Sequence, residues 1–171
     1  MSNTRIACAS DDVTGYRQPD PWAAQIALQY KRLMPWVNTQ AVEAAYSIIR
    51  AYSMLDGAVT EFLQPFGLTR PRFSVLRAIY LAPDRRLTMS EIGRETRATP
   101  TNATKLIEGL EQGGWVMRVA SPSDRRVVYA EFTPAGEARF ADLLPQFIKL
   151  HETVWGHFNA EEAAQVHSVL A

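Results

Sequence analysis

The segment between residues 88 and 114 constrains the fold more than any other part of the chain. Thr88-Met89-Ser90-Glu91 has the capping-box pattern, in which the Thr hydroxyl and the Glu carboxylate bind each other's free backbone amides at a helix start. A short helix is therefore predicted here, and Arg97-Ala98 leaves room only for a tight turn. Thr99 can cap a second helix that has proline at its first position and ends before Gly113-Gly114. Two short helices joined by a tight turn predict a helix-turn-helix.

A β-hairpin is predicted directly after the second helix. Residues 115–119 and 126–132 are rich in aromatic and β-branched side chains, and they flank a loop of Ala, Ser, Pro, Asp and Arg at residues 120–125. A helix-turn-helix that continues into a hairpin is a winged helix. The expected fold class is therefore mainly α with a small β-hairpin wing (α+β).

Long helices are predicted on both sides of this winged helix. We expect the following domains: a flexible N-terminal arm at 1–20, N-terminal helices of a dimerisation region at 21–66, the winged helix-turn-helix at 67–132, and C-terminal dimerisation helices at 133–171. A winged helix alone needs fewer than about 100 residues, so the apolar stripes of the outer helices require another partner. Self-association through a two-fold interface is the simplest solution, which predicts a homodimer.

Charge and composition set the expected compartment and partners. Residues 70–132 carry 11 basic and 7 acidic side chains, whereas the chain as a whole has net charge zero. A local basic face attracts nucleic acid regardless of the total charge, although a solvated surface is the alternative. The longest stretch without a charged residue is ten residues, and a membrane span needs about 20. With a single Cys8 and no leader pattern, we expect a cytoplasmic protein without membrane contact.

The order of these elements resembles the MarR family of bacterial transcription regulators. The most specific stretch is Asp124-Arg125-Arg126 followed by Phe132-Thr133-Pro134-Ala135-Gly136, which is similar to the family's wing signature D-x-R…L-T-x-x-G. Phe132 stands where the family usually has Leu. The resemblance implies a dimeric, sequence-specific regulator of transcription, in most cases a repressor, that binds double-stranded DNA.

The helix at residues 99–112 looks like the family's recognition helix. Ala103, Leu106, Ile107 and Leu110 have the spacing of a core-facing stripe. The remaining positions of its first turns are the predicted DNA-binding residues: Thr99, Thr101, Asn102, Thr104 and Lys105. Asn can pair with adenine, Thr can contact thymine, and Lys can reach guanine or phosphate. The alternative is that this composition only serves helix capping.

The wing is expected to contribute further DNA contacts. Arg126 is predicted to enter the minor groove and Arg125 to bind phosphate, with a solvated hairpin as the alternative. The resemblance implies a structural role for the acidic Asp124, which would pair within the wing and possibly with Arg118. A symmetric dimer would place two recognition helices in successive major grooves of a pseudo-palindromic operator.

The resemblance also implies a small effector, often an aromatic anion, that weakens DNA binding. Trp36, Tyr46, Arg50 and Phe73 are the predicted ligand-binding residues, with ordinary packing as the alternative for each. Arg50 lies on a mostly apolar helix, so it needs a carboxylate partner from the protein or from a ligand. Ser74 stands where the urate-responsive subgroup has an acidic residue, which argues against urate.

Other functions find little support in the sequence. Cys8 lies in the arm without a basic cluster, which argues against peroxide sensing. His151, His157 and His167 lack metal-ligand spacing, and there is no nucleotide-binding or nucleophile motif. We expect no cofactor, no metal and no enzymatic activity. The remaining alternative is a winged-helix protein-interaction or dimerisation module that does not bind DNA.

Overall fold

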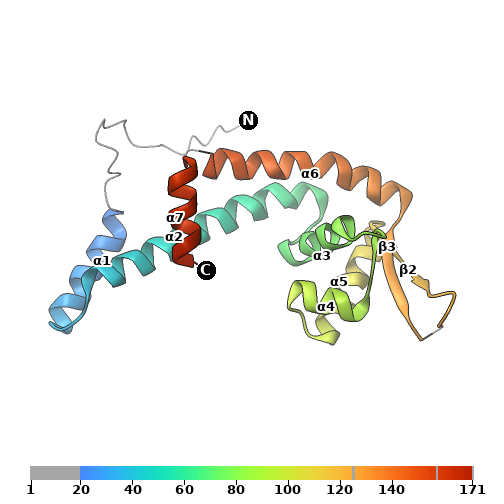
Figure 1. Cartoon of the computed structure of the whole chain (residues 1–171), viewed down its shortest axis with the longest axis horizontal. Coiled ribbons are helices and arrows are strands. Elements are labelled where there is room, and N and C mark those ends of the chain that lie inside the picture. The colour runs from blue at the N-terminus through green and yellow to red at the C-terminus, as the bar shows by residue number, and fades with distance from the viewer. Residues whose placement is uncertain (1–19, 125, 157, 171) are drawn as a thin grey trace. The chain divides into compact units, whose positions relative to one another are not determined.

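The computed structural model describes residues 20–124, 126–156 and 158–170 (Figure 1). The chain divides into two compact units, Met1–Met54 and Leu55–Ala171. Helix α2 continues from the first unit into the second. The helices, including the 3-10 helix η1, are α1 (Pro21–Leu33), α2 (Thr39–Leu63), η1 (Gln64–Phe66), α3 (Arg70–Leu81), α4 (Met89–Thr96), α5 (Pro100–Gln112), α6 (Pro134–Trp155) and α7 (Ala160–Leu170). The strands are β1 (Arg86–Thr88), β2 (Val116–Ala120) and β3 (Val128–Phe132).

In the first unit, α1 packs against the first half of α2. Asp20 caps α1, because its Oδ1 accepts a hydrogen bond of 3.1 Å from the backbone N–H of Trp22. Ala23 and Ala27 are buried, as small residues are where two helices approach closely. The ring of Tyr46 on α2 meets the edge of Trp22 with 5.7 Å between centroids, and its hydroxyl lies 3.2 Å from that of Tyr30.

The second unit has one hydrophobic core, and α3 is its central helix. Phe73, Leu76 and Ile79 on α3 are nearly inaccessible to solvent. They are joined in one buried cluster by Ile92 of α4, Ile107 of α5, Trp115 and Phe140. Each helix of the winged helix therefore buries one apolar stripe and leaves its opposite side for other contacts.

The predicted helix-turn-helix is confirmed in its local details. The backbone N–H of Glu91 donates to Thr88 Oγ1 at 3.3 Å, and the Thr88 N–H donates to the Glu91 carboxylate at 2.7 Å. The Glu91 carboxylate also accepts a hydrogen bond of 2.8 Å from the Thr88 hydroxyl. The bonds that it accepts from the backbone and then from the hydroxyl of Thr88 lower the pKa of Glu91. The turn is made at Arg97, whose φ of 52° is left-handed. Thr99 then caps α5 by accepting from the N–H of Asn102 at 3.3 Å.

The sheet has one strand more than the sequence predicted. The order is β1-β3-β2 and both pairs are antiparallel, with Leu87 opposite Ala130 and Val116 opposite Phe132. Strand β1 is only three residues long and pairs with a segment about 40 residues away, so its own sequence carries little signal. It ties the start of α4 to the base of the wing.

The end of the wing is fixed to the end of α5 by the T-x-x-G part of the signature. Thr133 Oγ1 donates to Gly114 O at 2.8 Å and accepts from Gly136 N at 2.9 Å, so one hydroxyl caps α6 and bridges two elements. A Cβ on Gly136 would lie 2.7 Å from the carbonyl carbon of Trp115, which is why this position has no side chain. Gly114 has a φ of +68° and makes the turn into β2.

The C-terminal helices form as predicted. Helix α6 runs from Pro134 to Trp155. Asn159 caps α7 by accepting from the N–H groups of Glu161 and Glu162. Within the ranges that the structure describes, no helix is long and apolar enough to cross a membrane.

Candidate nucleic-acid interface

Helix α5 separates its side chains into a buried stripe and an exposed face. Ala103, Ile107 and Leu110 are at most 1% exposed, and Leu106 is partly buried. The opposite face is open to solvent and presents the predicted DNA-binding residues Thr101, Asn102, Thr104 and Lys105. The helix is therefore held by its core face, while four polar side chains stand on a rigid element.

The polar groups of this face differ in how free they are. The Thr99 hydroxyl is used in capping, and Thr104 Oγ1 donates to the carbonyl of Pro100 at 3.0 Å. Among the residues that the structure describes, no hydrogen bond or ion pair engages the side chains of Asn102 and Lys105. Both can accept a partner from outside without breaking an internal contact.

The loop of the wing is organised by Asp124. Its carboxylate accepts two hydrogen bonds of 3.1 Å from Nε and Nη2 of Arg126, and one of 3.0 Å from the backbone N–H of Arg126. These contacts lower the pKa of Asp124, and the side-chain hydrogen bonds with Arg126 have a larger effect than the backbone one. The side chain of Arg126 is nonetheless 91% exposed. The predicted phosphate-binding residue Arg125 lies outside the described residues.

The expected contact between Asp124 and Arg118 is absent, because each residue has another partner. Arg118 on β2 forms an ion pair of 3.1 Å with Glu111 near the end of α5, and its own N–H donates to the same carboxylate at 3.2 Å. Its Nη2 also lies 3.5 Å from the carbonyl of Thr104. The sequence did not lead us to predict Glu111 as the partner of Arg118, although this acidic residue lies only seven residues before it. Arg118 joins the wing to α5.

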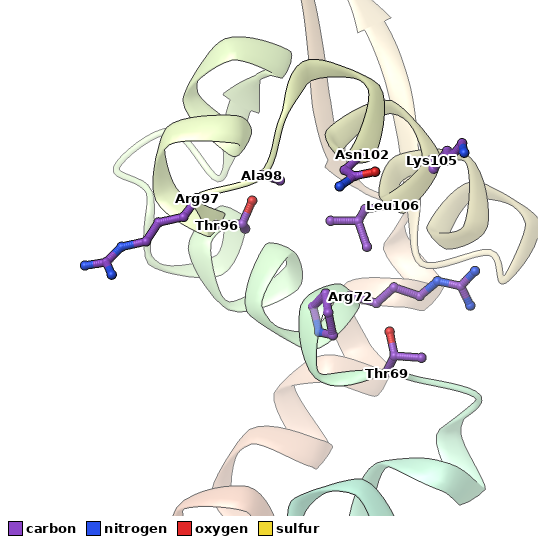
Figure 2. A pocket seen from close by; sticks show the side chains of 9 residues that line it. Thr69, Arg72, Thr96, Arg97, Ala98, Asn102, Lys105 and Leu106 are labelled. Atoms are coloured by element: carbon purple, nitrogen blue, oxygen red, sulfur yellow. The ribbon is translucent and has the colours of Figure 1, made fainter. Parts of the chain in front are cut away.

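An open pocket of about 520 Å³ lies between α3, the turn after α4, and α5 (Figure 2). It is lined by Thr69, Pro71, Arg72, Thr96, Arg97, Ala98, Asn102, Lys105 and Leu106. Three of these residues are cations and none is acidic. Two of the predicted DNA-binding residues, Asn102 and Lys105, are thus brought next to Arg72, which the sequence analysis did not select.

Two predicted ligand-binding residues, Tyr46 and Arg50, lie together in the first unit. Arg50 forms an ion pair of 2.7 Å with Asp20, and its guanidinium carbon lies 5.7 Å from the ring centroid of Trp22. The pKa of Tyr46 is raised, mainly because its hydroxyl is hydrogen-bonded to that of Tyr30. The carboxylate that Arg50 requires is therefore supplied by the protein itself. Trp36 is 81% exposed.

The other predicted ligand-binding residue belongs to the core of the second unit. Phe73 is 3% exposed, and its ring lies 4.2 Å from that of Phe147 and 5.6 Å from that of Phe140, between centroids. Its surroundings are those of a packing residue.

Cys8 and His157 lie outside the described residues, and within the described part no group of His, Cys, Asp and Glu could hold a metal ion.

Comparison with known proteins relates this architecture to one family. A MarR family sequence model matches residues 66–127. The regulator PrsX of Escherichia coli is 32% identical over 115 residues, which cover 67% of this chain and 69% of PrsX. The repressor YetL of Bacillus subtilis is 25% identical over 126 residues, 74% of this chain and 75% of YetL. The structure of Sco3205 from Streptomyces coelicolor in complex with DNA superposes with a TM-score of 0.73 at 23% identity, covering 79% of this chain and 86% of Sco3205.

Proposed function

This chain belongs to the MarR family of transcriptional regulators, and we propose that it is a sequence-specific repressor that reads duplex DNA with α5 and the wing. Asn102 is assigned to base edges in the major groove, with Thr101 and Thr104 offering methyl and hydroxyl contacts beside it. Lys105 is assigned to guanine or phosphate. Arg126 is assigned to the minor groove and Arg125 to the adjacent phosphate.

The exposed face of α5 is the observation that carries this proposal. Asn102 and Lys105 are solvent-exposed and have no partner among the described residues, on a helix that three buried residues hold in place. Their unsatisfied donors and acceptors match base edges and phosphates. A winged helix that had lost DNA binding and retained only a protein partner would need an apolar or acidic surface here, which this face does not have.

We assign the outer helices to a homodimer. Large apolar side chains remain exposed on α2, among them Ile48, Ile49 and Met54, and on α7, among them Val169 and Leu170. Burying them against a second copy removes them from water and duplicates the recognition helix. A two-fold dimer fits a pseudo-palindromic operator with half-sites about ten base pairs apart. Such a regulator acts where the chromosome lies, in the cytoplasm, and its activity is binding and not catalysis.

A small aromatic anion is the effector class that we assign to the first unit. A cation and two aromatic rings come together at Arg50, Trp22 and Tyr46. Arg50 forms an ion pair with Asp20 that solvent can reach, because the Arg50 side chain is 46% exposed and the Asp20 side chain 22%. A ligand carboxylate could replace Asp20 at this guanidinium. To release DNA, the ligand must bind more tightly to the protein conformation that does not bind DNA. The preference required is about 1.4 kcal/mol for each tenfold loss of DNA affinity.

The function is tested by mixing the purified protein with fragmented DNA of its own genome at about 0.15 M salt, where weak phosphate binding is partly screened, and sequencing the retained fragments. We expect a few pseudo-palindromic sites. No enrichment by a folded, dimeric protein, before and after refolding from denaturant to remove a bound ligand, would contradict DNA binding and favour a winged helix that serves a protein partner.

A further inference from the structure

Arg72 on α3 lies across the backbone of α5 at Gly109. A Cβ on Gly109 would lie 2.5 Å from Cζ and 2.7 Å from Nε of Arg72, so the guanidinium occupies the space that a side chain would take. Arg72 is the residue next to the buried Phe73, which anchors this part of α3 in the core. The absence of a side chain at position 109 thus lets a cation from a neighbouring helix reach the recognition helix.

This cation has no acidic partner in the described part of the chain. None of the ion pairs there involves Arg72, although the residue is half-buried. A partly desolvated guanidinium without a counter-charge is unfavourable unless an anion from outside completes the site.

Arg72 shares its pocket with the exposed end of the recognition helix. Lys105 and Asn102 of α5 line the same pocket, and Thr69 lines it from the start of α3. Figure 2 shows Arg72 and Lys105 on the same side of the pocket, whereas Arg97 extends away from it. The Thr69 hydroxyl makes no capping hydrogen bond to α3 and can donate to a ligand. Two cations, an amide and a hydroxyl therefore surround one open space of about 520 Å³.

We propose that this pocket binds a phosphate of the DNA backbone, held by Arg72 and Lys105, when α5 lies in the major groove. The inference rests on the proposed function. Phosphodiesters are the anions that lie beside a helix in the major groove, and Arg offers them a bidentate fork. The contact would fix the depth and orientation of α5 from a second helix, and it would be independent of base sequence.

The test is the salt dependence of DNA binding by Arg72→Gln, which removes the charge and keeps a polar chain over Gly109. The ligand is a mixed-sequence duplex of about 30 base pairs, together with a site retained from genomic DNA. A phosphate contact contributes about 0.9 to the slope of log K against log salt. We expect the slope to fall by about this amount for each bound protomer, with a loss of affinity of about fivefold per protomer at 0.15 M salt, equal for both duplexes.

Arg77→Gln is the matched control, because Arg77 is an exposed cation on the same helix outside the pocket. Its slope should equal that of the wild type. If Arg72→Gln has the same salt slope as the wild type, or if both variants lower the slope equally, the inference is wrong and the proposed function is unaffected. Failure of the wild type to bind either duplex would overturn the proposed function and the inference with it.

Inorganic phosphate at constant ionic strength separates a free anion from the DNA backbone. If amide chemical shifts around residues 102–106 show phosphate binding that Arg72→Gln abolishes, while the DNA slope of this variant is unchanged, the pocket holds a free anion and the DNA assignment is wrong. Circular dichroism of both variants verifies that they are folded.

Discussion

The guanidinium of Arg126 and the carboxylate of Asp124 form two parallel hydrogen bonds of 3.1 Å at the loop of the wing. The pairing directs an almost fully exposed Arg without burying it. In the interface proposed above, an acidic residue thereby serves a DNA-binding surface, because it orients the cation that is assigned to the minor groove.

Replacing Arg126 by Ala should weaken operator binding by about tenfold and leave the thermal unfolding midpoint unchanged. The side chain is 91% exposed, so its removal leaves the core intact and takes away only the proposed minor-groove contact. Fluorescence anisotropy with a labelled operator and differential scanning fluorimetry measure the two quantities. Normal affinity in a folded variant would remove the wing from the interface.

Asp124→Asn should weaken operator binding by about two- to fivefold, since the Arg remains but its orientation is lost. The lowered pKa of Asp124 means that the carboxylate is ionised at any pH above its ordinary value of 3.8, and the contribution is lost only as the pH falls through the lowered pKa. The affinity ratio of wild type to variant should therefore be constant between pH 6 and 8. A ratio that changes across this range would contradict the assignment.

Asn102→Ala should change sequence preference more than total affinity. Loss of a bidentate contact with adenine lowers discrimination at that base pair by about 1–3 kcal/mol. Selection from an operator library randomised at each position measures the preference, and binding to a mixed-sequence duplex serves as the control. An unchanged preference would exclude base reading by Asn102.

Gly136→Ala should destabilise the fold by about 1–3 kcal/mol, because the added Cβ would overlap the rigid backbone of Trp115. Gly57→Ala is the matched control: it lies in the exposed part of α2 with no atom within 4 Å of a built Cβ. Removing glycine from a helix interior there should stabilise by about 0.5–1 kcal/mol. Urea denaturation of both variants measures the sign of each effect, and a Gly136→Ala protein as stable as the wild type would contradict the packing argument.

Benzoate should quench tryptophan fluorescence and weaken DNA binding if an aromatic anion replaces Asp20 at Arg50. Arg50→Gln should lose both responses, because the cation that recognises the carboxylate is gone. Arg32→Gln, an exposed cation on α1, should respond like the wild type. Equal responses of all three proteins would place the effector elsewhere.

Most of the secondary structure was predictable because its determinants are local. The capping boxes at Thr88 and Asn159, the Thr-Pro starts of α5 and α6 and the apolar periodicity of α2 each act within a few residues along the chain. The apolar periodicity of α5 likewise predicted which side of this helix is buried, and hence which of its polar residues are exposed. The winged helix followed from the order of these elements.

The partners of individual side chains were decided only by the tertiary structure. Arg118 pairs with Glu111 and not Asp124, Arg50 meets Asp20 thirty residues away, and β1 exists because β3 lies beside it. Arg72 reaches the recognition helix because Gly109 leaves space on a different element. An ion pair or a strand pairing depends on distances between elements that sequence spacing does not encode, whereas a cap or a helical stripe is complete within its own segment.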